Sequence, residues 1–472
     1  MRTSIALLLA GLPLFLLAAC GPRPGPEPPG PTWTPEEVYR AEGDAGAAAG
    51  RGLQDARGII HGHSPYSHDA CDGEPRDPVT DAIDEACLDD LRRAICQTRH
   101  DFVMLSDHGE SFARSEFPDV LLHRPAEGDT LVDRGSGPVA NRIVCGDEST
   151  LVLAGTETGA MPVALEGHVD PDPAERARIY GSTEPADLMR LKAAGAVVLA
   201  QHTEDWSEDD LALKPFDGFE MYNLHANLFL NAGPALELIL LAQDPENFEL
   251  LPHPEVVLAL LFSEDPRYLD RWSGVLARGV QRVTTLATDA HRNSLPDLLQ
   301  DGERMDSFRR MMRMFSNHLL IEPGTGGGFD DRQLRDALRA GRLYGSFDYL
   351  GFPRGFDFHA REAGVVREMG ASVVVGSELV VEPPRIQNLD PEAAEPELTL
   401  RLLRATAGGW VEVASAPATG GTLRHTPSEP GAYRAEVRIR PFHLRGYLGD
   451  YEHLLDEQDF VWIYANPIYL EP

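Results

Sequence analysis

Short runs of β-branched and apolar residues alternate along most of this chain with longer segments of helical periodicity, and this alternation strongly constrains the fold. The runs expected to be strands lie at 58–60, 102–105, 151–154, 196–199, 218–221 and 283–287. The expected helices lie at 79–99, 185–194, 254–262, 266–278 and 331–340. Several of them begin with the Pro or Asp that suits a helix N-terminus. Strands that alternate with helices in this way predict an α/β fold.

The pattern changes near residue 370. Beyond this point, strand-like runs at 373–375, 398–400, 433–437 and 460–464 are separated by turns rich in Pro and Gly, which is typical of a small β-sandwich. Because single cores seldom grow beyond about 250 to 300 residues, a chain of 472 residues is expected to contain more than one domain. We therefore predict an α/β domain over residues 53–369 and a β-rich domain over residues 370–472.

Residues that commonly bind metals follow almost every expected strand of the α/β region. The first strand leads into His61-Gly62-His63, and side chains two positions apart on a strand point to the same face. The full set is His61, His63, His68, His108, Glu157, His168, His202, Asp289 and His291. The carboxyl ends of strands converge on one rim in barrel-like α/β folds, so these residues are expected to meet there. Imidazole and carboxylate together favour divalent Zn, Mn or Fe.

This ordered set resembles the motifs of the PHP (polymerase and histidinol phosphatase) superfamily. Glu157 followed by Gly167-His168 is similar to the CehA/McbA-like metallohydrolase branch, as are segments 431–437 and 465–469. The resemblance covers roughly residues 57–472. It implies a distorted (β/α)7 barrel with two or three metals at one mouth, followed by a small all-β, sandwich-like domain. It also implies that the nine residues of the set are ligands, with Glu157 as the bridging carboxylate.

Polar neighbours of these ligands are expected to complete the site. The family usually has Asp where His68 stands, and Asp69 lies directly beside it, so either residue can be the ligand. Asp107 is expected either to orient a ligand or to cap the end of its strand. Glu220 and Asn223 would support the ligands or the fold, and His225 would line the pocket. Arg292 is either a surface residue or a clamp for an anionic substrate.

The charge of such a site predicts hydrolysis. Water bound to divalent metals loses a proton near neutral pH, and two metals can hold both the resulting hydroxide and an oxygen of the substrate. Glu157, Asp289 and His291 are therefore predicted to serve catalysis in a phosphoesterase that acts on a small-molecule ester. Two alternatives remain open. One is a hydrolase of carboxylic esters, carbamates or amides with the same metals, and the other is a non-catalytic lipoprotein that binds envelope material.

The first twenty residues predict export and a lipid anchor. The apolar stretch 5–17 is too short to span a bilayer and is typical of a signal peptide over residues 1–20. Leu17-Ala18-Ala19-Cys20 resembles a bacterial lipobox, which implies cleavage before Cys20 and acylation of its thiol. Residues 21–52, rich in Pro, Gly and Ala, are expected to be a tether. The protein would thus be anchored on the periplasmic face of a membrane or at the cell surface.

Charge and cysteines narrow the expected partners and the compartment. A formal net charge of -33 repels polyanions, so long nucleic acids are not expected partners, and the oligomeric state stays open. With the lipidated cysteine set aside, Cys71, Cys87, Cys96 and Cys145 are enough for two disulfides. Cys87 and Cys96 point to nearly opposite sides of one expected helix, so each should pair elsewhere, with Cys71 and Cys145 as candidate partners.

Overall fold

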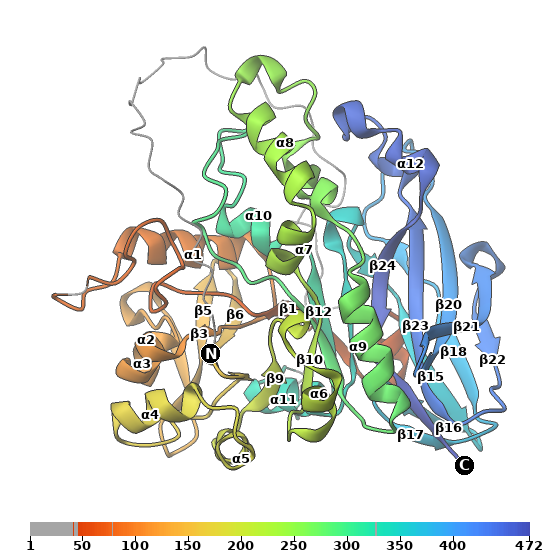
Figure 1. The fold of residues 1–472 in the computed structure, drawn as a ribbon, viewed down its shortest axis with the longest axis horizontal. Helices are drawn as coiled ribbons and strands as arrows, with labels where there is room; N and C mark the ends of the chain where they lie inside the picture. Colours follow the sequence, from red (N-terminus) through yellow and green to blue (C-terminus); the bar gives the residue numbers. More distant parts are fainter. Residues whose placement is uncertain (1–40, 42–45, 78, 326–327) are drawn as a thin grey trace.

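The computed structural model describes residues 41, 46–77, 79–325 and 328–472, which form a mixed α/β fold (Figure 1). The predicted signal peptide, Cys20 and residues 21–40 of the predicted tether lie outside the described residues. The last residues assigned to the tether form a 3-10 helix, Gly46–Arg51. Arg51 donates hydrogen bonds to Asp357 and Glu368 at 2.9 and 2.8 Å, so this end of the segment is packed against the C-terminal strands.

The largest sheet is mixed and runs through both predicted domains. In spatial order its path is β17 (Ser372–Val374), β25 (Ile468–Glu471), β23 (Gly431–Arg440), β24 (Phe460–Ala465), β13 (Leu343–Ser346), β12 (Ser316–Ile321), β1 (Gln54–Ile60), β2 (Phe102–Met104), β6 (Glu148–Leu153), β5 (Pro138–Cys145) and β4 (Thr130–Asp133), with β20 (Glu397–Thr406) and β21 (Gly409–Pro417) attached through β23. At its centre, β1 pairs in parallel with β2 and antiparallel with β12. A Cβ atom at Gly58 would lie 2.4 Å from the carbonyl oxygen of Phe102, so this close approach of β1 and β2 requires glycine.

A second sheet holds the later strands of the α/β region. Its order is β11 (Val283–Ala287), β10 (Gly218–Asn223), β9 (Val197–Ala200) and β8 (Met161–Val163). Side chains from both sheets, including Ile60 and Met104 from one and Val197 and Leu199 from the other, pack in one core cluster. The two sheets therefore enclose a common interior. All six strands predicted for the α/β region are present, and each observed end lies within four residues of the predicted one.

The two sheets meet at the carboxyl ends of β1 and β11. The amide of Asp289 donates to the carbonyl of His61, and the amide of His63 donates to the carbonyl of Ala290, both at 3.0 Å. A short parallel pair, β3 (Asp107–His108) and β7 (Thr156–Glu157), continues the chain beyond β2 and β6. Parallel strands thus deliver their C-terminal residues to one region, as the sequence predicts.

Helices surround these sheets. They are α1 (Glu85–Thr98), α2 (Gly109–Arg114), α3 (Phe117–Val120), α4 (Pro173–Tyr180), α5 (Pro185–Ala193), α6 (Glu208–Leu213), α7 (Leu224–Leu230), α8 (Ala232–Ala242), α9 (Pro266–Ala277), α10 (Phe308–Met312), α11 (Asp331–Arg339) and α12 (Leu454–Glu457). Helix α1 begins six residues later than predicted because the Asp84 side chain accepts the amides of Ala86 and Cys87 and caps it. The predicted helix at 254–262 is a 3-10 helix, Pro254–Leu261.

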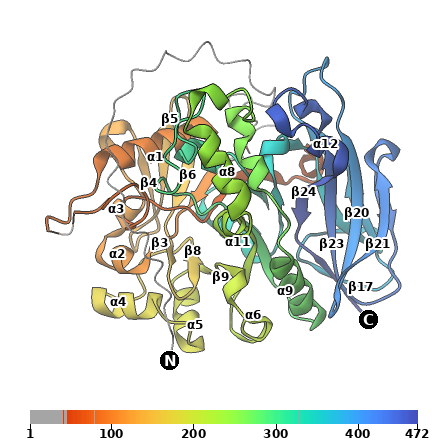
Figure 2. The ribbon, with the colours of Figure 1, turned by 45° about the horizontal axis from the view of Figure 1, so that its top comes forward.

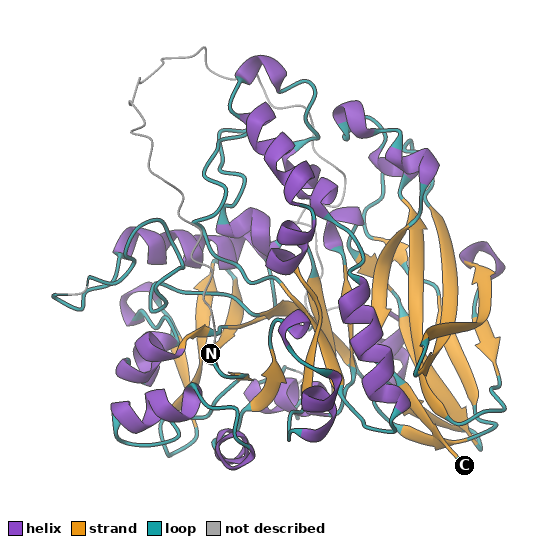
Figure 3. Cartoon of the chain, in the orientation of Figure 1, coloured by secondary structure: helices purple, strands orange, loops and turns teal. Residues whose placement is uncertain are grey.

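Strands dominate the C-terminal part of the chain (Figure 3). A four-stranded antiparallel sheet joins β16 (Val365–Glu368), β15 (Asp357–Glu362), β18 (Glu378–Glu382) and β22 (Leu423–His425). The strand pairing does not change at residue 370, because β15 pairs with β18 and β13 pairs with β24, and both partners lie beyond this residue. The β-rich part therefore begins before residue 370 and continues the large sheet.

Two disulfides hold the first helix to the chain on either side of it. Cys71 pairs with Cys87, and Cys96 pairs with Cys145. The prediction that Cys87 and Cys96 pair elsewhere is confirmed. Since Cys71 lies shortly after the loop that follows β1, the first disulfide ties that loop to α1.

Within the described part of the chain, no single helix is long and apolar enough to cross a bilayer. Helices α7 and α8 together meet the criteria of length and composition, but they are bent by 92° relative to each other.

Candidate metal centre

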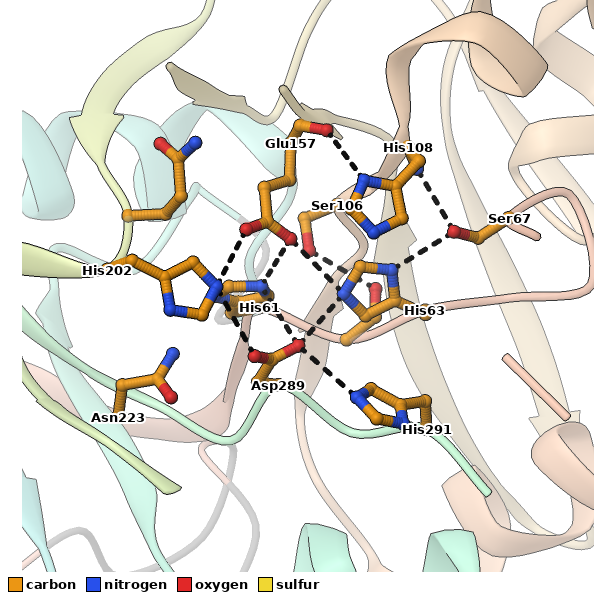
Figure 4. Close-up of polar contacts among 12 residues, drawn as sticks. His61, His63, Ser67, Ser106, His108, Glu157, His202, Asn223, Asp289 and His291 are labelled. Atoms are coloured by element: carbon orange, nitrogen blue, oxygen red, sulfur yellow. Dashed lines mark hydrogen bonds and ion pairs between the residues drawn. The ribbon is translucent and has the colours of Figure 1, made fainter. Parts of the chain in front are cut away.

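Four buried side chains from the ends of β1 and β11 and from the short strand β7 converge on one point (Figure 4). They are His61, His63, Glu157 and Asp289, whose potential ligand atoms all lie within 4.8 Å of one another. Nε2 of His61 is 2.9 Å from Glu157 Oε2 and 3.2 Å from Asp289 Oδ1, and Nε2 of His63 is 3.0 Å from Asp289 Oδ1. The convergence predicted from strand ends is therefore present for these residues.

The backbone at three residues of this cluster is left-handed. The φ angles of His61, His202 and Asp289 are 77°, 46° and 51°. Residues other than glycine rarely adopt such positive φ angles. Each of these residues lies one or two positions after the end of a strand. The left-handed backbone there interrupts the strand geometry, so the side chain no longer follows the alternation of faces along the strand. Such strain costs on the order of 1–3 kcal/mol per residue and tends to gather at functional sites.

Glu157 faces histidines with both of its carboxylate oxygens. Oε2 lies 2.9 Å from His61 and 3.4 Å from His63, while Oε1 lies 3.0 Å from Nε2 of His202. Each oxygen can therefore serve a different ion, which is the arrangement that a bridging carboxylate requires.

A second group of potential ligand atoms comprises His63, Asp69 and His108. Oδ2 of Asp69 is 2.9 Å from Nε2 of His108, and Oδ1 is 3.4 Å from Nδ1 of His63. His68 is exposed, and its ring lies beside that of His108 with centroids 4.5 Å apart. Of the two alternatives left open by the sequence, the structure brings Asp69 into the cluster and leaves His68 outside it.

A third group comprises His225, Asp289 and His291. Nε2 of His291 lies 4.0 Å from Oδ1 of Asp289, and the rings of His225 and His291 are tilted by 31° with centroids 4.0 Å apart. His225, which the sequence analysis assigned to the pocket wall, thus stands among the potential ligands.

His168 does not join any of these groups. Its Nδ1 lies 2.9 Å from the hydroxyl of Tyr180, and its Nε2 lies 2.7 Å from the carbonyl oxygen of Ser115. The ring also packs edge-on against Phe112 and Phe117. Both ring nitrogens are therefore engaged away from the cluster, and the structure does not support the prediction of His168 as a ligand.

The two buried carboxylates predicted as neighbours hold the ligands in place. Oε1 of Glu220 lies 2.6 Å from Nδ1 of His61, and its Oε2 accepts the backbone amide of His202 at 2.8 Å. Asp107 accepts both the amide and the hydroxyl of Ser64, at 2.6 and 2.7 Å, and so fixes the loop that carries His61 and His63. These contacts give Glu220 and Asp107 positioning roles.

The remaining predicted neighbours have structural contacts. Asn223 accepts the amide of Ala226 and so caps α7, and its amide group donates to Glu220 at 3.3 Å. Arg292 forms an ion pair with Asp90, so its guanidinium is engaged by the protein.

Three contacts of the cluster were not foreseen from the sequence. Nδ1 of His202 lies 3.5 Å from Glu204, and Nδ1 of His291 lies 2.6 Å from Asn293 Oδ1. The hydroxyl of Ser67 donates to Asp69 at 2.6 Å. Glu204 and Asn293 each stand two residues after a cluster histidine, where a turn can bring a side chain back to the ring, and this spacing was the available signal.

Burial and charge together determine the protonation of the metal-free cluster. Burial alone would lower the pKa values of His61, His63 and His202, but nearby carboxylates outweigh it. They raise the pKa of His63 to about 10 and that of His202 to about 11. Burial acts in the opposite sense on Glu157 and Asp289, yet the imidazoles hold the pKa of each carboxyl well below its usual range. In the metal-free chain, protons therefore balance the carboxylates.

Other buried groups shift in the direction that burial dictates. Burial, assisted by the neighbouring imidazole of His225, lowers the pKa of His291 to about 4. Burial also raises the pKa of Asp107 to about 6. His291 is thus a neutral imidazole at physiological pH, as a metal ligand must be.

The donor set suits divalent transition metals. Imidazole nitrogens and carboxylate oxygens are mixed in each group, and such mixtures favour Zn, Mn or Fe over Mg or Ca. Divalent ions would also supply the positive charge that protons provide in the metal-free chain. Buried His, Glu and Asp residues that can hold a metal ion are therefore a property of this fold.

A cavity of about 420 Å³ opens beside this cluster. Its lining includes His68, Arg76, His108, Glu110 and Arg114. The volume lies within the range of pockets that bind small molecules. A small ligand in this cavity would therefore reach His108.

A scan against models of protein families, a search of curated proteins and a search of solved structures each found no match for this chain.

Proposed function

We propose that this protein is a metal-dependent phosphoesterase of the PHP type that uses two or three divalent transition metals. The observation that carries this proposal is the convergence of His61, His63, Glu157 and Asp289 on one point. The proposal includes the finer architecture expected from the resemblance. In it, a distorted (β/α)7 barrel carries the site, and a small β-rich domain, whose strands begin before residue 370, follows it.

Bound divalent ions would lower the pKa of a coordinated water and polarise an ester oxygen of the substrate. The chain's own residues prepare this chemistry. Glu220 accepts the Nδ1 proton of His61, so that displacement of the Nε2 proton by a metal would leave a lone pair directed between Glu157 and Asp289. The two oxygens of Glu157 face separate histidines, so that this residue can hold two ions at once.

The substrate is proposed to be a small anionic ester. The cavity beside His108 has the size of a small-molecule pocket. Arg76 and Arg114 lie on its wall together with Glu74, Asp77, Asp81 and Glu110, and Arg114 is 3.9 Å from Asp81. The anionic oxygens of a phosphoester would therefore be held by the metals and not by a free guanidinium.

The protein is further proposed to be exported and anchored by a lipid on Cys20. The lipobox-like segment 17–20 carries this expectation. Two disulfides, Cys71–Cys87 and Cys96–Cys145, are consistent with an oxidising compartment outside the cytoplasm.

The proposal is tested on the purified full chain. Metal content is measured by mass spectrometry, and hydrolysis of 4-nitrophenyl phosphate, bis(4-nitrophenyl) phosphate and 4-nitrophenyl acetate is compared. We expect stoichiometric transition metal and preferential hydrolysis of one of the phosphoesters. A chain that binds no transition metal would contradict the metal centre, whereas a metal-loaded chain that cleaves only the acetate would change the bond class.

A further inference from the structure

His225 is a half-buried residue whose Nε2 atom is shielded from solvent and, in the described part of the chain, lacks a hydrogen-bond partner. An unpaired buried polar group costs about 1–3 kcal/mol, so its presence calls for a physical reason. Every other histidine of the three ligand groups has a carboxylate, carbonyl or amide oxygen within 3.2 Å of a ring nitrogen. His225 is therefore unusual within the cluster.

The space next to His225 is surrounded by electron-pair donors. Nδ1 of His291 lies 2.6 Å from the side-chain oxygen of Asn293, so Nδ1 carries the proton and Nε2 offers a lone pair. That lone pair faces Oδ1 of Asp289 at 4.0 Å, and a carboxylate oxygen is also only an acceptor. A cation between these two acceptors would bind both, and the potential ligand atoms of His225, Asp289 and His291 all lie within 4.8 Å of one another. Ligand distances of about 2.0–2.2 Å to a divalent metal allow ligand–ligand separations of up to about 4.4 Å, and the observed separation lies within this limit.

We propose that His225, together with Asp289 and His291, is a ligand of a divalent transition metal, at a position distinct from that held by His61 and Glu157. Asp289 joins the two positions, because its Oδ1 also lies near His61 and His63. Helix α7 supplies this ligand, since His225 is its second residue. The inference rests on the proposed metal centre and adds a ligand to it.

The test compares metal binding by the full chain with that of two variants. His225→Phe keeps the ring packed on His291 but removes both nitrogens, and His225→Asn is a smaller replacement. Zn²⁺ stoichiometry is measured by mass spectrometry after equilibrium dialysis, and Co²⁺ absorption spectra report the coordination. We expect both variants to lose one equivalent of metal relative to the unsubstituted chain. His359→Phe replaces a buried histidine on β15 and should keep the full complement.

A direct measurement does not depend on the folding of a variant. Anomalous diffraction at the zinc edge from crystals of the unsubstituted chain should place an ion within bonding distance of His225. Ions confined to the other two groups, or equal stoichiometry in His225→Phe, would overturn the inference while leaving the proposed function intact. Absence of any bound metal would contradict the proposed function itself.

A separate observation concerns the outer surface of α7 and α8. Phe229, Leu230, Leu236 and Leu240 are exposed there, with 79 %, 47 %, 56 % and 58 % of each residue accessible. Glu237 is the only Asp, Glu, Lys or Arg of the two helices. Helix α8 lies at the upper edge of the molecule in Figure 1 and remains at the surface in Figure 2. Clustered exposed apolar side chains of this kind mark interaction surfaces.

The sequence points to the kind of partner that covers this surface. Between the predicted acylation site at Cys20 and the first described residue, Ala41, the chain extends at most roughly 70 Å. The folded part has an expected radius of gyration of about 22 Å. With the proposed lipid anchor, a chain of this reach allows any face of the folded part to approach the bilayer. The face that buries exposed apolar side chains in the lipid is then favoured. With eleven residues, α8 is too short to cross a bilayer but suits its interface.

The geometry points to α7 and α8 as an element that docks on a zwitterionic lipid surface. A formal charge of -33 disfavours anionic lipid, and the apolar face supplies the attraction. Since α7 directly follows β10 and carries His225, docking would hold the candidate metal centre next to the membrane.

Lipid contact is tested on the full chain in phosphatidylcholine vesicles with and without a doxyl-labelled phosphatidylcholine. Phe229→Trp and Leu236→Trp should lose fluorescence to the quencher, whereas Val365→Trp, an exposed position on β16, should not. The unsubstituted chain gives the background of the native tryptophans. Equal quenching at all three positions, or none at residues 229 and 236, would overturn the inference. Cross-links between residues 229 of two copies without quenching would identify a second copy as the occupant.

Discussion

Two buried groups of charged side chains in this molecule differ in the kind of cation that they contain. In the C-terminal strands, Arg434 is almost fully buried and forms a 2.8 Å ion pair with Glu436, whose other carboxylate oxygen is 2.8 Å from the partly exposed Arg401. Its guanidinium lies 4.6, 4.4 and 4.9 Å from the ring centroids of Trp272, Trp410 and Tyr464. Arginine keeps its charge in proteins, so this group cannot exchange its cation for another.

At the strand ends, imidazoles provide the positive charge instead. His61, His63 and His202 face Glu157 and Asp289, and they hold protons only while nothing else balances these carboxylates. A divalent ion can replace those protons because neutral imidazole is a ligand. Buried charge can therefore be exchanged for a bound ion only where the cation is able to leave, as at the strand ends.

The largest expected effect is a loss of folding stability on disruption of the Arg434–Glu436 ion pair, which should leave metal binding unchanged. Glu436→Leu leaves Arg434 buried without its anion, so we expect the free energy of unfolding to fall by about 3–5 kcal/mol in urea titrations. Adding Arg434→Met should recover most of this loss, since a buried pair replaced by apolar side chains costs little. A loss as large in the double variant as in the single one would contradict this account. Metal content of the folded protein should not change in either variant.

Removal of the proposed bridging carboxylate should weaken both metal binding and phosphoesterase activity. Glu157→Gln keeps the shape of the side chain but removes the charge that faces His61 and His202. We expect metal affinity and phosphoesterase activity to fall by more than about a hundredfold, because even the loss of an indirect contact costs about 10- to 100-fold. Glu378→Gln, which changes a partly exposed ion pair with Arg424, should leave both quantities unchanged. Full activity in Glu157→Gln would show that the site assignment is wrong.

The contact between Glu220 and His61 should have an intermediate effect. Glu220→Ala removes the acceptor 2.6 Å from Nδ1 of His61, so the ring loses its orientation. We expect metal affinity to fall by about 10- to 100-fold in competition titrations with a chelator. Glu220→Gln retains an acceptor oxygen and should recover part of the affinity. Equal losses in the two variants would indicate that the charge of Glu220, and not its hydrogen bond, is what matters.

The pH dependence of metal binding distinguishes the histidine cluster from the Arg434 group without mutation. The pKa values of about 10 for His63 and about 11 for His202 mean that both rings hold protons in the metal-free chain at neutral pH. Metal binding must displace these protons, so the apparent affinity should rise by about tenfold per pH unit for each proton released, from pH 6 to 9. Isothermal titration in buffers of different ionisation enthalpy measures the proton release. An affinity that does not change with pH would contradict protonation of the cluster.

The sequence was sufficient to predict the features that depend on local pattern. The strands end where apolar runs meet His or Asp, so His61, His63, Glu157 and Asp289 could be assigned to one rim before any coordinates. His168 could not be placed, because its position depends on contacts with Tyr180 and Ser115 that have no signature in the chain. The continuity of the large sheet through β13 and β24 is a long-range pairing that periodicity does not reveal.

The choice between His68 and Asp69 required coordinates for the same reason. Adjacent residues in an irregular loop carry no alternation that tells which side chain points inward, whereas the hydroxyl of Ser67 and the ring of His108 fix Asp69 in the structure. The proposed role of His225 was also hidden, since a histidine at this position is more often a residue that lines the pocket.

The smallest expected effect belongs to His68. Because its side chain is exposed and only its ring face contacts His108, His68→Ala should change metal affinity by no more than about 0.5 kcal/mol, or roughly twofold. Asp69→Asn, one residue away, removes a charge 2.9 Å from Nε2 of His108 and should weaken binding by about tenfold. Chelator competition on the two variants measures the difference between the two residues. A larger loss in His68→Ala than in Asp69→Asn would restore His68 as the ligand, and the loop after β1 would then have to turn its side chains the other way.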